Sequence, residues 1–193
     1  VSLEEAFEQT FFCLNRYLGW EVGHIWILDE HPEKLKLKSG LWYLSDSDRF
    51  AVFKEASEQL ASQDKNYSLL EYTFWEGHPV WMENLATYSG FHLSHTARFC
   101  GLNTGIFLPL QQGGKAVAML ELFSSQTLPF HKESLELLQQ VTVHLGYVIS
   151  RVHMQADLIH SQQRLSEAQR LAKMCSWEWD LDKDKGYWEP VIE

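Results

Sequence analysis

Basic residues are scarce in this sequence and never gather into a cluster. Its 193 residues include 16 Lys and Arg against 26 Asp and Glu, which gives a formal net charge of −10 at pH 7. Because nucleic acids and anionic membrane surfaces are both bound by a concentrated basic face, this composition argues against both. We therefore expect no nucleic acid and no direct membrane contact among the partners of this protein.

Long apolar runs are missing as well. A membrane-spanning helix needs about 20 mainly apolar residues in succession, and no stretch of the sequence approaches that length. The first residues, Val1–Glu5, are acidic, whereas a secretory signal peptide starts with basic residues. We expect a cytoplasmic protein. Because the sequence begins without Met and stops soon after a Trp-rich, strand-like segment, we also expect it to be a piece of a longer protein.

Cysteine is rare, and the three cysteines, Cys13, Cys100 and Cys175, lie far apart. An odd number without Cys-x-x-Cys spacing indicates neither a disulfide framework nor a zinc knuckle. We expect three reduced thiols and no metal site. His92 and His95 lie close to Cys100 and are ligand types suited to zinc or haem, but the chain has nine histidines, and a solvated loop explains this spacing better.

The hydrophobic pattern alternates between helical and strand-like periods, and 45% hydrophobic residues suffice for one buried core. Spacings of three and four predict helices over Leu3–Leu18, Asp48–Ala61 and Leu69–Trp75. Apolar runs bounded by turn residues predict strands over Val22–Leu28, Leu35–Leu44, Val80–Met82, Thr104–Leu110 and Ala116–Phe123. This order predicts an α+β fold, with helices on both sides of a central antiparallel sheet.

The segment Lys132–Lys173 predicts a helix of a different kind, because it has no Pro and only one Gly. About 40 residues at 1.5 Å each would give about 60 Å of helix. Apolar residues recur every seven positions in one register, at Leu138, Leu145, Val152 and Ile159, and then in a register shifted by one, at Leu158, Leu165 and Ala172. This pattern is typical of a two-helix seam with a phase slip, so we expect a homodimer through this helix. The alternative is that its first half packs on the sheet and the rest is a solvated linker.

Five segments carry a resemblance to a known family: Gly19–His24, Gly40–Leu44, Gly77–Trp81, Gly101–Gly105 and Leu120–Ser124. Together with the order of elements, they make the chain resemble a GAF domain, most of all the GAF modules of bacterial multidomain sensor histidine kinases and diguanylate cyclases. Residues Ser166–Ala172 and Ser176–Leu181 resemble the start of a PAS domain. The resemblance implies a GAF sensory domain over residues 1–151, a coiled-coil signalling helix over 152–173 and the truncated start of a PAS domain over 174–193.

One departure from the family pattern concerns the expected ligand pocket. Members of this subfamily usually read Gly-Leu-Pro-Gly before the segment that corresponds to Gly77–Trp81, whereas this sequence has Ser68-Leu69-Leu70-Glu71. Both glycines are replaced, so the backbone loses conformational freedom at these positions. The sequence leaves open whether Ser68 and Glu71 abolish the pocket.

Aromatic residues are abundant, with eight Trp, seven Tyr and eleven Phe. The resemblance implies that pocket-lining elements carry Trp42, Trp75, Trp81, Phe99 and Phe107. Aromatic walls suit a planar or apolar ligand, although ordinary core packing explains each of these residues as well. The polar groups expected to point into the same pocket are His24, Arg98 and Glu121, the last because it interrupts an otherwise apolar strand.

Motifs of enzymatic chemistry are absent: there is no nucleophile elbow and no phosphate-binding loop. Some GAF-type proteins reduce free methionine sulfoxide through reactive cysteines, but Cys100 has no adjacent Lys or Cys to support such a role. Covalent bilin attachment in photosensory GAF domains uses a Cys-His pair, whereas Cys100 precedes Gly101. The signature of cyclic-nucleotide GAF domains is not met around Phe130. We expect no catalytic residue and no required cofactor, with an unidentified small molecule as the ligand if one binds.

The predicted function is therefore a regulatory sensor module of a signal-transduction protein. It would bind a small molecule or relay a neighbouring domain's state through the long helix to a PAS and an output domain, of the histidine kinase or diguanylate cyclase type. A structural dimerisation module with a filled pocket is the first alternative, and a Cys-dependent methionine sulfoxide reductase is the second.

Overall fold

The computed structural model describes residues 2–31, 34–62, 68–88, 90–171, 177–180 and 183–188. The chain divides into two compact units, Val1–Ser150 and Arg151–Glu193. One helix, α5 (Lys132–Leu171), is continuous across this division. None of the helices in the described ranges is both long and apolar enough to cross a membrane.

The first unit is built on a five-stranded antiparallel sheet with the strand order β2-β1-β5-β4-β3. Its strands are β1 (Val22–His31), β2 (Lys34–Leu44), β3 (Val80–Met82), β4 (Thr104–Gln112) and β5 (Lys115–Ser124). All of them were expected from the apolar pattern, and those of the two hairpins extend beyond the predicted ends. The predicted α+β class with a central antiparallel sheet is confirmed.

A two-residue turn, Gly113-Gly114, joins β4 to β5. Its φ angles of 58° and 79° both lie in the left-handed region, which a type I′ hairpin turn requires and which glycine adopts without strain. Next to the turn, Gln111 pairs with Ala116, and the register then shifts by one residue between Leu110 and Gln111. Beyond this irregularity, Phe107 pairs with Glu121 and Leu108 with Leu120.

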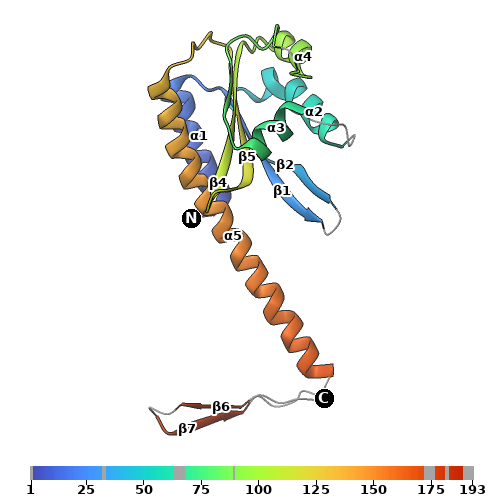
Figure 1. Ribbon diagram of the computed structural model, residues 1–193, viewed down its shortest axis with the longest axis vertical. Coiled ribbons are helices and arrows are strands. Elements are labelled where there is room, and N and C mark those ends of the chain that lie inside the picture. The colour runs from blue at the N-terminus through green and yellow to red at the C-terminus, as the bar shows by residue number, and fades with distance from the viewer. Residues whose placement is uncertain are drawn as a thin grey trace. The chain divides into compact units, whose positions relative to one another are not determined.

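Helices cover both faces of this sheet (Figure 1). One face carries α1 (Leu3–Leu18) and the first part of α5, which lie side by side, and the other carries α2 (Ser47–Ser62), α3 (Ser68–Glu76) and α4 (Ser94–Phe99). Successive residues of a strand point to opposite faces. In β5, Ala118, Leu120 and Leu122 therefore belong to the core under α1 and α5. Met119 and Phe123 belong to the core under α2, α3 and α4.

Helix α1 is defined at both ends by local interactions. Ser2 and Glu5 form a capping box, in which each side chain accepts a hydrogen bond from the other residue's backbone N–H. Gly19 ends the helix with φ 75°. The helix lies close to β1 because Gly23 has no side chain: a Cβ there would be 1.6 Å from Cε1 of Phe11. This close approach buries Phe11 completely.

Helix α5 has 40 residues, and its first part is a core element. Leu138, Leu145 and Ile149 are 0%, 2% and 0% exposed, and they pack into the core under α1 and α5. The sequence pattern assigns Leu138 and Leu145 to a dimer seam, but this assignment is wrong, because both side chains are buried within one chain. A helix that packs on a sheet needs an apolar stripe just as a coiled coil does, so the recurrence alone does not identify the partner.

The second unit contains the rest of α5 and a two-stranded hairpin, β6 (Trp177–Asp180) and β7 (Lys185–Trp188). Within α5 its large apolar side chains are solvent-exposed, by 39% to 75%, at Val152, Met154, Leu158, Ile159, Leu165 and Leu171. The predictions for Ala172 and Cys175 lie outside the described residues.

The burial of Leu138 predicts its effect on stability. Leu138→Ala is expected to lower the free energy of unfolding by about 2–5 kcal/mol, because it leaves a cavity in a packed core. Leu137→Ala deletes the same atoms from a neighbouring side chain that is 45% exposed, and should change stability by less than about 0.5 kcal/mol.

Urea denaturation of both variants at two protein concentrations checks this. The loss caused by Leu138→Ala should be the same at both concentrations. A loss that disappears on dilution would show that Leu138 packs against a second chain and not against the sheet.

Candidate functional site

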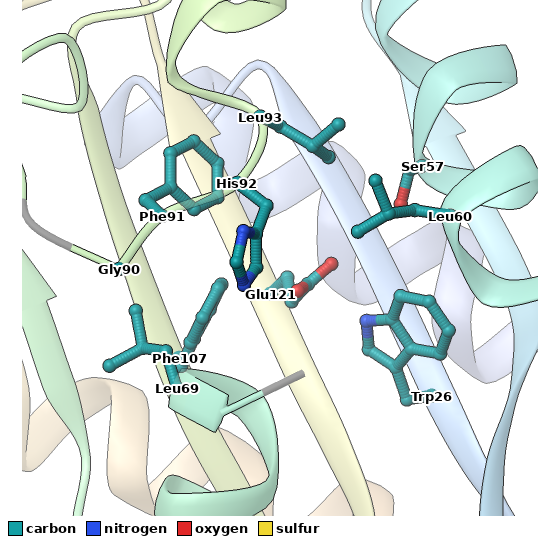
Figure 2. Close-up of a pocket in the computed structure, with 10 residues that line it drawn as sticks. All are labelled: Trp26, Ser57, Leu60, Leu69, Gly90, Phe91, His92, Leu93, Phe107 and Glu121. Carbon is teal, nitrogen blue, oxygen red and sulfur yellow. The ribbon is translucent and has the colours of Figure 1, made fainter. Parts of the chain in front are cut away.

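A small cavity lies between the sheet and the helices α2 to α4 (Figure 2). Ten residues from β1, α2, α3, the loop before α4, β4 and β5 line it: Trp26, Ser57, Leu60, Leu69, Gly90, Phe91, His92, Leu93, Phe107 and Glu121. Its volume is about 30 Å³, about two to three times the 10–15 Å³ that a cavity needs in order to hold one water molecule. Cavities that enclose drug-sized ligands measure about 300–1,000 Å³. In this state the cavity has room for a small chemical group only.

The walls of the cavity are mostly aromatic and aliphatic. Trp26, Phe91 and Phe107 are 1%, 7% and 3% exposed, and the rings of Phe91 and Phe107 meet edge to face with their centroids 6.2 Å apart. Gly90 and His92 are exposed, so the cavity communicates with solvent at this loop. Apolar walls with a few polar groups are the usual composition of a ligand site.

The cavity's acidic group, Glu121, forms a buried pair with His24. The register of β1 and β5 places the two residues opposite each other. Nδ1 of His24 lies 3.1 Å from Oε2 of Glu121, and their side chains are 0% and 7% exposed. Ionisable groups are rarely buried this deeply without further partners.

Further partners of His24 come from β2. The imidazole stacks on the indole of Trp42 with 3.8 Å between ring centroids and 7° between planes. Its Nε2 is 2.9 Å from Oγ of Ser39, and the same Oγ accepts a hydrogen bond from Nε1 of Trp42 at 3.2 Å. A bulge in the pairing between His24 and Trp26 shifts the register so that Ser39 lies opposite Trp26. These contacts fix the orientation of the imidazole.

Burial decides the charge of His24. Desolvation lowers its pKa below the usual 6.5 and outweighs the hydrogen bond and negative charge of Glu121, which raise it. Of the other charged groups nearby, Glu58 raises the pKa and Lys54 lowers it, both by less. A neutral imidazole carries one N–H. Nδ1–H then donates a hydrogen bond to Glu121, and Nε2 accepts a hydrogen bond from the hydroxyl of Ser39. His24 therefore gives the Glu121 carboxylate a hydrogen bond but no positive charge.

The structure brings together part of the residues that the sequence suggested for a pocket. Phe107 and Glu121 line the cavity. His24 contacts Glu121 directly, and Trp42 stacks on the other side of His24. These four residues come from four strands of the sheet, β1, β2, β4 and β5.

The other suggested residues lie elsewhere. Trp81 packs into the core under α1 and α5 and donates a hydrogen bond to the Leu128 carbonyl at 3.1 Å, because on β3 it is Val80 that faces α2 to α4. Trp75 and Phe99 are 60% and 75% exposed. Arg98, at the end of α4, is exposed as well. None of these side chains lines the cavity.

Several lining residues were missed. Trp26 lies two positions after His24 on the same face of β1, so strand alternation could have identified it. Ser57 follows Phe53 by four residues in α2, on the same side of the helix. No periodic signal marks Phe91 and His92, which lie in an irregular loop.

The described residues favour neither metal binding nor thiol chemistry. No group of three or more His, Cys, Asp or Glu in the described part of the chain could hold a metal ion. Cys13 is exposed and Cys100 is buried, both as free thiols. Burial raises the pKa of the Cys100 thiol, which disfavours the reactive thiolate.

Comparison with known families identifies this architecture. The family model described as GAF domain matches residues 1–150. The chain therefore belongs to the GAF domain family.

Solved structures share the fold at low sequence identity. The GAF domain of a two-component sensor histidine kinase from Bacillus halodurans is 17% identical with a TM-score of 0.58, over 80% of this chain and 98% of that chain. A GAF domain/HD domain protein from Geobacter sulfurreducens is 12% identical with a TM-score of 0.60, over 80% and 95%. Type II free methionine-R-sulfoxide reductase from Thermoplasma acidophilum is 13% identical with a TM-score of 0.55, over 77% and 93%. No curated protein matches the sequence.

The neutral state of His24 predicts a pH dependence of stability. Its pKa is lower in the folded than in the unfolded chain, so below about pH 6.5 the unfolded chain binds more protons and stability falls as the pH falls. In His24→Gln this part of the slope should be lost, a difference of at most about 1.4 kcal/mol per pH unit.

Urea denaturation at several pH values between about 7.5 and 5.5 measures the slope. His160→Gln removes an exposed histidine and serves as the control, with a slope like that of the parent chain. Equal slopes for the parent and His24→Gln would show that His24 does not titrate differently on unfolding.

Proposed function

We propose that this chain is the sensory GAF module of a signal-transduction protein, in which the occupancy of the cavity changes the state of α5. One observation carries the proposal: the cavity and α5 lie on opposite faces of the same two strands. Phe107 and Glu121 line the cavity, whereas their neighbours Leu108, Leu120 and Leu122 belong to the core that contains Leu138, Leu145 and Ile149 of α5.

A ligand acts on α5 only if it binds two arrangements of the protein with different affinity. Packed interiors are too dense to absorb a shift of a strand without repacking. A group that enters the cavity displaces Phe107 or Glu121, and with them β4 and β5. The side chains on the other face of these strands then reposition the buried stripe of α5.

The output of the module is a change within a homodimer of α5. In the second unit, four apolar side chains of this helix are between 50% and 61% exposed: Met154, Leu158, Ile159 and Leu165. Spacings of four and seven between them suit a seam with a second copy of the helix. The seam that we propose therefore begins at Val152 and excludes the core residues Leu138 and Leu145.

The domains that follow belong to the same proposal. The hairpin β6–β7 is the start of a PAS domain, and the output is of the histidine kinase or diguanylate cyclase type. A two-stranded hairpin is marginal by itself in water, and Trp179 is 51% exposed, which suits a segment of a larger sheet. The likeness to the GAF domain of a sensor histidine kinase supports this context. Catalysis by the present chain is not part of the proposal.

The small volume of the cavity, about 30 Å³, favours a second candidate, a dimerisation module that binds no ligand. The two candidates share the dimer and differ in whether the cavity admits a ligand. Tryptophan fluorescence of the chain, to which Trp26 in the cavity wall contributes, should respond to a ligand in the sensor and to none in the dimerisation module.

The proposed dimer can be tested at Leu158 and Ile159, where the two seven-residue registers of α5 meet. The double substitution Leu158→Asp and Ile159→Asp should dissociate the dimer, because each buried carboxylate would face its symmetry mate. Sedimentation equilibrium of the parent and the variant measures the change.

The matched control is His160→Asp with Gln163→Asp, which introduces the same side chains at exposed positions outside the seam. This control should remain a dimer. A parent chain that sediments as a monomer at high concentration would contradict the proposed dimer.

A further inference from the structure

Glu121 has fewer partners than a buried carboxylate normally requires. Its side chain is 7% exposed, and Oε2 accepts a hydrogen bond from Nδ1 of His24 at 3.1 Å. Within the described ranges, no other hydrogen bond or ion pair reaches this carboxylate. Two cations of α2 are paired with other carboxylates, Arg49 with Glu21 at 3.4 Å and Lys54 with Glu58 at 3.9 Å.

The charge of this carboxylate is not offset by its partner. His24 is held neutral by burial, so it contributes a hydrogen bond and no positive charge. An ionised carboxylate in an apolar environment is costly unless a cation lies beside it. The position of Glu121 on the cavity wall leaves space for such a cation to enter from solvent.

The aromatic walls favour the same kind of occupant. Figure 2 shows Glu121 in the middle of the cavity lining, with the rings of Phe91 and Phe107 on one side and Trp26 on the other. The faces of aromatic rings carry negative electrostatic potential and attract cations within about 6 Å of the ring centre. Leu60, Leu69 and Leu93 complete the wall with aliphatic groups that suit methylene and methyl carbons.

The dimensions limit how large this cation can be. A volume of about 30 Å³ accepts a charged head of one or two heavy atoms. Gly90 and His92, which are exposed on the open side, allow a longer substituent to extend toward solvent. A metal ion is a poor fit, because the described residues contain no group of three or more side chains that could ligate one.

We propose that the cavity binds a small organic ammonium ion, with its charged nitrogen against the Glu121 carboxylate and its carbon atoms between Trp26, Phe91 and Phe107. This inference rests on the proposed sensory function and specifies the ligand class of the same cavity. Anions are excluded by repulsion from Glu121, and neutral molecules of the same size leave its charge without a counterion.

Isothermal titration calorimetry with ethylammonium chloride tests the proposal on the intact chain. Ethylammonium should bind to the parent, whereas ethanol and sodium propionate, which match its size without its charge, should give no binding heat. Glu121→Gln keeps the volume of the side chain and an acceptor for His24, and removes the charge. We expect its affinity for ethylammonium to fall about tenfold or more.

The matched control is Glu58→Gln, which removes a carboxylate whose charge also acts on His24 but which does not line the cavity. Its affinity for ethylammonium should stay within about twofold of the parent. Phe107→Leu keeps an apolar wall and removes one aromatic face, so it should bind several-fold more weakly. This variant keeps the test decisive if Glu121→Gln does not fold.

Three results would overturn the ligand class. The parent does not bind ethylammonium, or Glu121→Gln and Glu58→Gln bind ethylammonium with equal affinity, or the parent binds ethanol as tightly as ethylammonium. Each is distinguishable from failure of the proposed function. If ethylammonium does not bind while the α5 substitutions still dissociate the dimer, the ligand class alone is wrong. If ethylammonium binds and the parent is a monomer, the relay through α5 is wrong and the binding site stands.

Discussion

The rest of the structure depends on the alternation of side chains along β4 and β5. Phe107 and Glu121 face the cavity, while Leu108 and Leu120 face α5. A register shift of one residue would exchange the two faces and move a carboxylate into the core under α5. Beside the turn Gly113-Gly114, Gln111 pairs with Ala116, and an irregularity between Leu110 and Gln111 then shifts the pairing by one residue, so that Phe107 lies opposite Glu121. The turn and this irregularity together determine which side chains of β4 and β5 face the cavity and which face α5.

Burying the polar cluster around Glu121 costs folding free energy in a core of this size. His24 is fully buried, loses hydration, and is kept neutral at the centre of the sheet. Replacing a buried polar pair with apolar residues of similar volume is often neutral or stabilising in other proteins. Stability alone therefore gives little reason for a carboxylate at position 121. A ligand that supplies the missing positive charge does give a reason, and departures from local design rules of this kind are expected at functional sites.

Local signals predicted most of the fold, whereas the choice of partner for each surface was not predictable. The helical spacing over Leu3–Leu18 and the apolar strand patterns are encoded within a few residues, and the structure confirms the corresponding elements. Glu121 was identifiable because a carboxylate interrupts an apolar strand. Leu138 was misassigned because a seven-residue recurrence fits a neighbouring helix and a sheet equally well. Trp81 lies one residue from the position that faces α2 to α4, and no pattern marks the loop with Phe91 and His92.

The central claim is that the cavity and α5 are coupled through the shared strands. Amide hydrogen exchange of the intact chain, with and without saturating ethylammonium, tests this coupling most directly. The account predicts increased protection in β4 and β5 and also in α5 between Leu138 and Ile149, which lies on the far face of the sheet. Increased protection confined to α2, α3, α4 and the loop around Phe91 would contradict it, because the ligand would then bind without changing the strands that contact α5.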